Sequence, residues 1–429
     1  SYAVELISNN QSFWSALEVI DNPWQRIRYG FLSEFANHVD TAKQVEWAKR
    51  LHLTSIQFYD WAYKHEFLMA PGESYADPLG GVISKSKLKE LIAGYEAAGI
   101  FPSGYAAVYA VDREGWARWK DSGVYGDDGK PFQLGEDFLW VVDPADQKWL
   151  PHFIEQLKAA HDFGFKSFHL DQYGWPKRAV KADGTVLDIA EQFTKMLDAI
   201  TSEVSGAHFI FNNVNDFPTW ATAKTAQDAT YIEDIAGANA ALELSLSVIS
   251  SRGASHLITG GDGKVLHDPY YVRNHQAGPS TLAILENYYN FITAAGDYLF
   301  SPSRADITRT HAFGVNSEIA IESNDPISPN FEAKGLTTAV FDSDEGLTIH
   351  IHNLLDQENS EWDVAKKAIT KQSSVKISIL SAGYKDEWHV GRANESAKFE
   401  LQKATQIADK LVLDVAITGA WTFIHVPKN

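Results

Sequence analysis

Two carboxylates stand in strongly apolar surroundings. Asp171 closes the run "FKSFHLD" (165–171), and Glu233 lies in "ATYIED" (229–234). A pair of carboxylic groups can cleave a glycosidic bond without metal or cofactor, because one attacks the anomeric carbon or activates water while the other protonates the leaving oxygen. The isoleucines around Glu233 favour the protonated form that the second role needs. Each residue keeps a simpler alternative, since Asp171 could form a turn or a helix cap and Glu233 could cap a helix near Ala236.

Further polar and aromatic side chains surround the ends of the predicted strands. They are Asp60, Trp61, His65, Tyr109, His169, Gln172, Tyr173, Asn212, Asn213 and Asp262. Carboxylates, amides and aromatic rings gathered on one face are the composition of a carbohydrate cleft. We expect Asp262 to be an alternative acid, and Gln172 and Tyr173 to shape the floor of the site. His169, two residues before Asp171, could instead be a buried residue of the interior.

An alternation of short apolar runs and amphipathic stretches must position these side chains. The strand candidates are residues 26–35, 54–61, 100–111, 165–171, 208–215, 229–234, 255–262 and 297–302, and the clearest helices are 41–52, 85–99, 144–164 and 279–296. Eight such units predict a (β/α)8 TIM barrel, and no GxGxxG or Walker-type loop follows any strand. In such barrels the chemistry lies at the carboxyl ends of the strands, where these polar residues stand.

The pattern changes near residue 335. Runs at 335–354, 373–382, 410–418 and 420–427 alternate with turn residues and lack long helical periodicity. This pattern predicts a C-terminal antiparallel β-sandwich domain. The expected organisation is therefore a lead-in over 1–20, a catalytic barrel over 21–334 and a β-sandwich over 335–429.

Composition restricts the partners. The net charge of −19 disfavours nucleic acid and anionic lipid, and no apolar run approaches the ~20 residues of a membrane span. There is no cysteine and there are only two methionines, which fits an extracellular, secreted protein, with the cell surface or the periplasm as alternatives. The loop "GDGKVLHDPYY" (261–271) resembles a calcium loop only loosely, and no zinc pattern occurs, so we expect no metal and no cofactor.

Several motifs together resemble glycoside hydrolase family 66, the dextranase and cycloisomaltooligosaccharide glucanotransferase family. They are "RYGFLSEF", "SIQFYDWAYKHE", "YADPLGGVISKSKLKELIAGYEAAGIFPSGYAAVY", "GFKSFHLDQYG", "FNNVNDF" and "YIEDI", in this order over about residues 20–300. The resemblance implies a (β/α)8 catalytic domain followed by a β-sandwich, acting on α-1,6-linked glucan with retention of configuration. It also implies that Asp171 is the nucleophile and Glu233 the acid/base.

The resemblance suggests roles for Asp60, Trp61 and His65, and strand-end positions suggest roles for the other surrounding residues. Asp60, Trp61 and His65 resemble the motif that lines the nonreducing-end subsite, where Asp60 would bind sugar hydroxyls. Trp61 would supply an apolar ring face, although it could instead fill the mouth of the barrel. Tyr109 and His169 could bind near the scissile sugar. The amides Asn212 and Asn213 would contact the sugar 2-OH or orient the nucleophile.

The chain also departs from the family pattern. The family usually carries an immunoglobulin-like domain before the barrel, whereas here residues 1–20 lead almost directly into it, so we expect either a truncated N-terminal module, of which 1–20 could be the remnant, or a minimal member of the family. No carbohydrate-binding module interrupts the barrel, which favours hydrolysis over cyclisation. Ile235 stands where an aromatic residue is common, so a different α-glucan preference stays open.

The resulting prediction is a monomeric, retaining endo-glycosidase that cleaves α-1,6 linkages of a dextran-like glucan. Two alternatives remain. A transglycosylase would pass the glucosyl intermediate to a sugar hydroxyl and form cyclic or linear isomalto-oligosaccharides. A non-catalytic carbohydrate-binding protein would use the same aromatic and amide side chains, but the presence of both carboxylates disfavours it.

Overall fold

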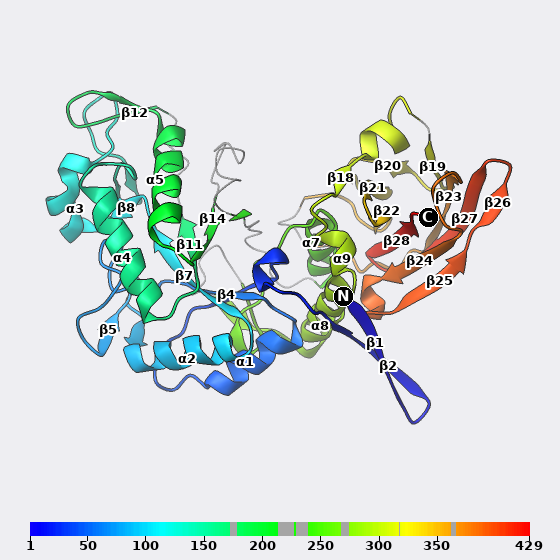
Figure 1. The fold of residues 1–429 in the computed structure, drawn as a ribbon, viewed down its shortest axis with the longest axis horizontal. Helices are drawn as coiled ribbons and strands as arrows, with labels where there is room; N and C mark the ends of the chain where they lie inside the picture. Colours follow the sequence, from blue (N-terminus) through cyan, green and yellow to red (C-terminus); the bar gives the residue numbers. More distant parts are fainter. Residues whose placement is uncertain (172–177, 213–226, 229–238, 267–273, 317, 362–365) are drawn as a thin grey trace.

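A six-stranded parallel sheet forms the centre of the N-terminal part of the chain (Figure 1). The computed structural model describes residues 1–171, 178–212, 227–228, 239–266, 274–316, 318–361 and 366–429. Across the sheet the strands follow their order in the chain: β3 (Tyr29–Leu32), β4 (Ser55–Phe58), β7 (Phe101–Ala107), β11 (Ser167–Asp171), β14 (His208–Phe211) and β15 (Gln227–Asp228). All five ladders are parallel, as strands separated by crossover helices must be.

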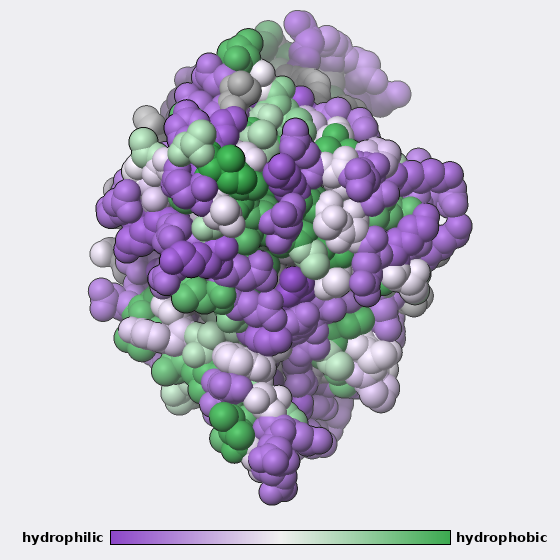
Figure 2. Space-filling model, turned by 90° about the vertical axis from the view of Figure 1, so that its right-hand side faces the viewer, coloured by the Kyte–Doolittle hydropathy of each residue, from purple (hydrophilic) through white to green (hydrophobic). Residues whose placement is uncertain are grey.

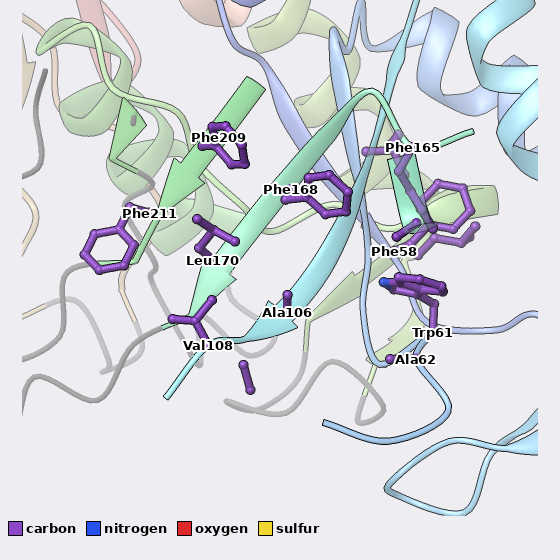
Figure 3. Packing of buried hydrophobic residues seen from close by; sticks show 14 of the residues in the cluster. Phe58, Trp61, Ala62, Ala106, Val108, Phe165, Phe168, Leu170, Phe209 and Phe211 are labelled. Carbon is purple, nitrogen blue, oxygen red and sulfur yellow. The ribbon is translucent and has the colours of Figure 1, made fainter. Parts of the chain in front are cut away.

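The helices between these strands pack on one face of the sheet. They are α1 (Thr41–Arg50), α2 (Lys85–Ala97), α4 (Trp149–Phe163) and α5 (Ile189–Glu203). Phe58, Phe168 and Leu170 point to this face and belong to the same buried cluster as Leu157 and Leu197 of the helices (Figure 3). Because side chains alternate along a strand, the residues between them face the other side of the sheet.

Side chains on that other, inner face are more polar than those under the helices. The paired strand positions there carry Gln57, Ser103, Tyr105 and His169, together with Tyr29. Gln57, Ser103 and His169 are fully buried. Polar side chains on this face continue to the carboxyl ends of the strands. Candidate site residues predicted from the sequence lie at these ends.

The ladders among the described residues do not close into a ring. Beyond β3 the sheet is extended by the segment around Gly260, which bridges Phe31 in parallel, and the Phe31 N–H donates to the Thr259 carbonyl at 3.0 Å. This segment belongs to the predicted strand over 255–262. The predicted strand over 229–234 lies outside the described residues.

The predicted strand over 297–302 is wrong, because the structure has the short helix α9 (Gly296–Leu299) there. The segment around Gly260 already occupies the edge beside β3, so this run is not needed as a strand. Asp297 instead pairs with Arg26 and with the amino group of Ser1, and Leu299 is buried. A short apolar run by itself does not distinguish a strand from a buried helix.

Shorter elements fill the connections. β5 (Ser74–Ala76) pairs with β6 (Val82–Ser84), β10 (Leu139–Val141) with β8 (Ala110–Val111) and β9 (Gln133–Leu134), β12 (Ala179–Val180) with β13 (Val186–Leu187), and β16 (Lys264–Leu266) with β17 (Asn274–Gln276). The remaining helices are α3 (Arg113–Trp119), α7 (Asn239–Ser251) and α8 (Pro279–Ala294).

Two further sheets form the C-terminal part. One runs β18 (Ala305–Asp306), β21 (Leu336–Ser343), β22 (Gly346–Asn353), β28 (Trp421–Pro427), β24 (Glu387–Arg392), β25 (Phe399–Lys403), with β20 (Ile327–Ser328) on β21. The other runs β19 (Ile319–Glu322), β23 (Ser373–Leu380), β27 (Lys410–Ile417), β26 (Thr405–Ile407). A shared buried cluster joins both sheets, with Ile349 and Ile424 from one and Ile377 and Val415 from the other.

These strands begin at Ala305, earlier than the predicted boundary at 335. The difference arises because β18, β19 and β20 are only two to four residues long, too short to show an alternating pattern. The outward side of the C-terminal strands is mainly hydrophilic, with interspersed hydrophobic patches (Figure 2).

The expected lead-in over 1–20 forms a hairpin of β1 (Tyr2–Ser8) and β2 (Gln11–Leu17) that projects from the body (Figure 1). Ala16 packs against Ala294 of α8 and against Ala397. The hairpin is thereby attached to the last long helix of the N-terminal part.

Candidate active site

Asp171 is the last residue of β11, and donors from two neighbouring strands hold its carboxylate. The Tyr105 hydroxyl donates to Oδ2 at 2.7 Å, and the Asn212 side-chain amide donates to Oδ1 at 2.8 Å. Sheet register explains this convergence: His169 pairs with Tyr105, and Asn212 directly follows β14, where its N–H donates to the Leu170 carbonyl. Each carboxylate oxygen therefore has a neutral donor that fixes its orientation.

Tyr105 is suited to remain a donor. Burial, together with the nearby Asp171 carboxylate and further tyrosines, raises the pKa of its hydroxyl well above the ordinary value. The group therefore stays protonated at neutral pH and donates to Asp171. Tyr105 was not predicted from the sequence, because the apolar run predicts a strand to residue 111 with Tyr109 near its end, whereas β7 ends at Ala107.

Two further carboxyl groups are those of Asp60 and Asp77, and Asp60 is close enough for the charges of both Asp77 and Asp171 to act on it. Burial, followed by the charges of Asp77 and Asp171, raises the pKa of Asp60 to about 7. Asp60 also has a φ of 48°, in the left-handed region that non-glycine residues seldom adopt. Asp77, which was not predicted from the sequence, accepts from the Leu79 and Gly81 N–H groups at 2.7 and 2.9 Å. Burial also raises its pKa. These three residues are called the carboxyl cluster below.

His169 is a buried residue of β11, two positions before Asp171. Its Nδ1 is 3.0 Å from the Tyr29 hydroxyl, and its ring stacks with Tyr29 and Tyr105 at centroid distances of 5.9 and 6.1 Å. Burial lowers the pKa of His169 to about 3, so the ring is neutral at physiological pH. The structure thus places it in the buried interior, which was the alternative considered from the sequence.

Trp61 also lies in the core, which corrects the expectation that its ring face is open to sugar. Only 1% of the residue is exposed, and its ring packs on Phe165 with centroids 4.4 Å apart (Figure 3). The indole N–H donates to the Tyr105 carbonyl at 3.1 Å. Trp61 therefore supports the strand that carries Tyr105, and its ring contacts protein.

His65 and Tyr109 are buried as well. His65 lines a cavity of about 440 Å³ together with Asp77, Asp112 and Phe138. Burial lowers its pKa to about 4. Tyr109 is 4% exposed, and its carbonyl accepts from the Val142 N–H at 2.8 Å. Asp77 links this cavity to the carboxyl cluster.

Asp262 lies apart from Asp171. It is an exposed residue with a φ of 54° in the turn Gly261–Gly263 beside α1, and its carbonyl accepts from Gln276. Gln172, Tyr173, Asn213 and Glu233 lie outside the described residues. The arrangement around Asp171 is therefore an oriented carboxylate whose charge acts on Asp60, built from residues at or near the ends of β4, β7, β11 and β14.

The described residues show no group of three or more side chains suited to hold a metal ion. In the same part of the chain, no helix combines the length and apolar character that crossing a bilayer requires.

The chain is similar to cycloisomaltooligosaccharide glucanotransferases. Two of these, from Niallia circulans, are 27% and 25% identical to it over 226 and 210 residues, which are 48% and 44% of this chain. The matches span only 23% and 22% of those proteins, so the chain covers less than a quarter of each.

Several solved structures have a fold similar to that of this chain. A cycloisomaltooligosaccharide glucanotransferase from Paenibacillus sp., complexed with cycloisomaltoheptaose, superposes with a TM-score of 0.83 at 14% identity, over 97% of this chain and 87% of that one. A maltogenic α-amylase from Thermotoga neapolitana gives 0.57 at 10% identity, over 94% and 99%. The family model of glycosyl hydrolase family 66 matches residues 3–240 and 237–390, nearly the whole chain. With its oriented strand-end carboxylate, this chain belongs to glycosyl hydrolase family 66.

Proposed function

We propose that the chain is a retaining, endo-acting glycoside hydrolase that cleaves α-1,6 linkages of a dextran-like glucan. The observation that carries this proposal is the Asp171 carboxylate, which Tyr105 and Asn212 hold in one orientation at the end of β11. A nucleophile must present one lone pair toward the anomeric carbon, and neutral donors fix its position without neutralising its charge. The proposal includes a closed (β/α)8 barrel around this site.

In this mechanism Asp171 attacks the anomeric carbon while Glu233 protonates the departing glycosidic oxygen. The glucosyl–Asp171 ester forms as the glycosidic bond breaks, and Glu233 then removes a proton from water, which attacks the anomeric carbon and breaks its bond to the Asp171 oxygen. The ester hydrolysis restores the Asp171 carboxylate and the Glu233 acid. Asn212 also lies where it could contact the sugar 2-OH.

The nucleophile is tested with Asp171→Asn. Turnover of dextran should fall below detection, whereas the folded state and binding of isomalto-oligosaccharides persist, because the amide keeps the shape but is not nucleophilic. A mechanism-based glucosyl trap followed by peptide mass mapping should label Asp171. Label on Asp60 or Asp262 would contradict the assignment. In a crystal structure, retention requires the Asp171 and Glu233 carboxyl groups to lie about 5–5.5 Å apart, whereas ~6.5–9.5 Å would indicate inversion.

Transglycosylation is the second candidate, and the names of the similar Niallia circulans proteins favour it. Both reactions share the glucosyl intermediate and differ only in whether water or a sugar hydroxyl attacks it. Product analysis after incubation with dextran separates them, because linear isomalto-oligosaccharides that grow with time indicate hydrolysis and cyclic products indicate transfer. Parallel incubations with pullulan and starch test the linkage preference.

A further inference from the structure

A second cavity of about 440 Å³ lies near the amino-terminal end of β3. Its walls come from Ile27 and Tyr29, before and at the start of β3, from Ile210 of β14, from the turn after α7, from the end of α9 and the residues that follow it, and from Phe341 of β21. Since β3 begins at Tyr29 and β11 ends at Asp171, the parallel strands place these two sites at opposite ends. The cavity therefore lies between the parallel sheet and the C-terminal strands.

The charge of this cavity differs in sign from that of the whole molecule. Among the described residues that line it, the charged ones are Arg252, Arg304 and Asp306, in a chain whose net charge is −19. Two cations and one carboxylate give the cavity a positive excess. A local positive site in an acidic protein concentrates anions there and not elsewhere on its surface.

Arg304 is held rigidly in the wall. Its guanidinium lies 3.5 Å from the centre of the Phe341 ring, and Nη2 donates to the Ser251 carbonyl at 2.5 Å and lies 3.0 Å from His350 Nε2. Its Nε is buried and has no hydrogen-bond partner in the described part of the chain. Burial, together with the charge of Arg252, lowers the pKa of Arg304 to about 9, so it remains a cation at neutral pH.

Arg252 supplies the second cation and remains available. It directly follows α7 and is exposed, its N–H donates to the Ile249 carbonyl at 3.1 Å, and no hydrogen bond or ion pair joins its guanidinium to the residues the structure describes. Gly253, at a φ of 74°, lets the turn approach the Arg304 guanidinium, since a Cβ there would lie 2.8 Å from the Leu299 carbonyl oxygen and 3.4 Å from Arg304 Nη1. The turn thus brings Arg252 to the cavity that Arg304 lines.

We propose that this cavity binds a ligand through its oxyanion group, a phosphate, sulfate or carboxylate, held between Arg252 and Arg304. Guanidinium groups form charge-assisted hydrogen bonds to such oxygens. The cavity volume falls in the range of small-molecule sites, so it accommodates a body of about monosaccharide size attached to the anion. The Phe341 ring is covered by Arg304 on the face toward the guanidinium, which disfavours a neutral sugar stacked on that face.

The test is calorimetric titration of the whole chain with inorganic phosphate, glucose 6-phosphate and glucose. Both anions should bind at a site that Arg252→Ala weakens, whereas glucose should show no binding that depends on Arg252. Tighter binding of glucose 6-phosphate would show that the cavity recognises the attached body, whereas equal affinities would show recognition of the oxyanion alone. Rising salt concentration should weaken both affinities, because the interaction is electrostatic.

Three variants assign the binding to this cavity. Arg252→Ala should weaken it by about tenfold or more, the loss expected when one charge-assisted hydrogen bond disappears. Asp306→Asn should strengthen it, because it removes the opposing charge and keeps the oxygen that accepts from Thr308. Arg178→Ala is the matched control, since Arg178 is an exposed arginine that pairs with Asp127 and does not line the cavity. The affinity of the Arg178→Ala variant for both anions should equal that of the parent chain.

Three results would overturn the proposal: glucose binding that Arg252→Ala weakens as much as it weakens glucose 6-phosphate binding, no binding of either anion, or an anion affinity that Arg252→Ala leaves unchanged. Dextran cleavage by Arg252→Ala should equal that of the parent chain, because the variant lies outside the candidate active site. The outcome is therefore independent of the proposed glycosidase activity.

Discussion

The Asp171 carboxylate depends on a tyrosine that comes from the neighbouring strand and not from its own. Tyr105→Phe removes the hydroxyl that donates to Oδ2 and preserves the ring that stacks with His169. A hydrogen bond to a charged group contributes about 1.5–3 kcal/mol, so kcat on dextran should fall roughly 10- to 100-fold, with the thermal unfolding temperature little changed.

Tyr109→Phe is the control for this prediction. Tyr109 is also a buried tyrosine, but the hydroxyl that donates to Asp171 Oδ2 belongs to Tyr105. The kcat of Tyr109→Phe should fall much less. Equal losses in the two variants would mean that the contact with Asp171 is not what matters.

Asp60 should make stability depend on pH. Its pKa in the folded protein, about 7, lies above the unfolded value near 4, so between these values the folded state holds more protons than the unfolded state. The free energy of unfolding should therefore decrease as the pH rises from about 4 to about 7, by roughly 2–4 kcal/mol at most.

The Asp60→Asn variant isolates this effect, because the amide cannot ionise. Urea unfolding at pH 5 and pH 8 should show a smaller loss of stability in the variant than in the parent chain. A pH dependence that is identical in the two proteins would contradict the assignment of the raised pKa to Asp60.

Site residues could be predicted from the sequence only where the end of a strand was located correctly. Apolar runs followed by polar residues identified Asp171, Asp60 and Asn212, and the structure brings all three together because parallel strands end at one edge of the sheet. Tyr105 was missed because the end of β7 was placed four residues too late. Asp77 was missed because it follows β5, a strand of only three residues that is too short to show an alternating pattern.

Elements that depend on tertiary contacts were harder to predict. α9 was mistaken for a strand because its apolar run is as short as a strand, and the place beside β3 was taken by the segment around Gly260. The aromatic ring of Trp61 suggested a sugar platform, but burial is decided by Phe165, which is distant in the sequence. The pattern of apolar and polar residues along the chain predicts neither the pairing of the Gly260 segment with β3 nor the packing of Trp61 on Phe165.

Trp61 connects the end of β4 to β7, and its replacement separates a core role from a sugar-binding role. Trp61→Ala should destabilise the protein by about 3–5 kcal/mol, the cost of emptying a large buried site. Trp61→Phe keeps most of the packing and loses the bond to the Tyr105 carbonyl, so it should cost about 1–3 kcal/mol.

Urea unfolding and dextran kinetics of these two variants check the prediction. Trp61→Phe should lower stability and leave KM close to the parent value. A large rise in KM with unchanged stability would instead support direct sugar stacking by the indole.

At the scale of the whole molecule, buried charges attach the N-terminal hairpin to the sheet and to α9. Glu18, which follows β2, accepts from Arg28 at 2.6 Å and from Arg26 at 3.0 Å, and Arg26 also pairs with Asp297 of α9. The Glu18 and Arg28 side chains are each only 5% exposed. Burial opposes ionisation of Glu18, but the two arginines outweigh it and lower its pKa below the ordinary value.

Glu18→Gln should therefore destabilise the protein by about 3 kcal/mol at pH 7, because Arg28 remains buried without its charged partner. Since the folded pKa of Glu18 is lowered, its contribution is complete above the unfolded value of about 4.3 and disappears as the pH falls through the folded value. The stability difference between the parent chain and Glu18→Gln in urea unfolding should consequently shrink from pH 7 to pH 3. Glu5→Gln, an exposed change on the same hairpin, should show no difference at either pH. A difference for Glu18→Gln that stays constant over this range would mean that the ion pair with Arg28 does not hold the hairpin in place.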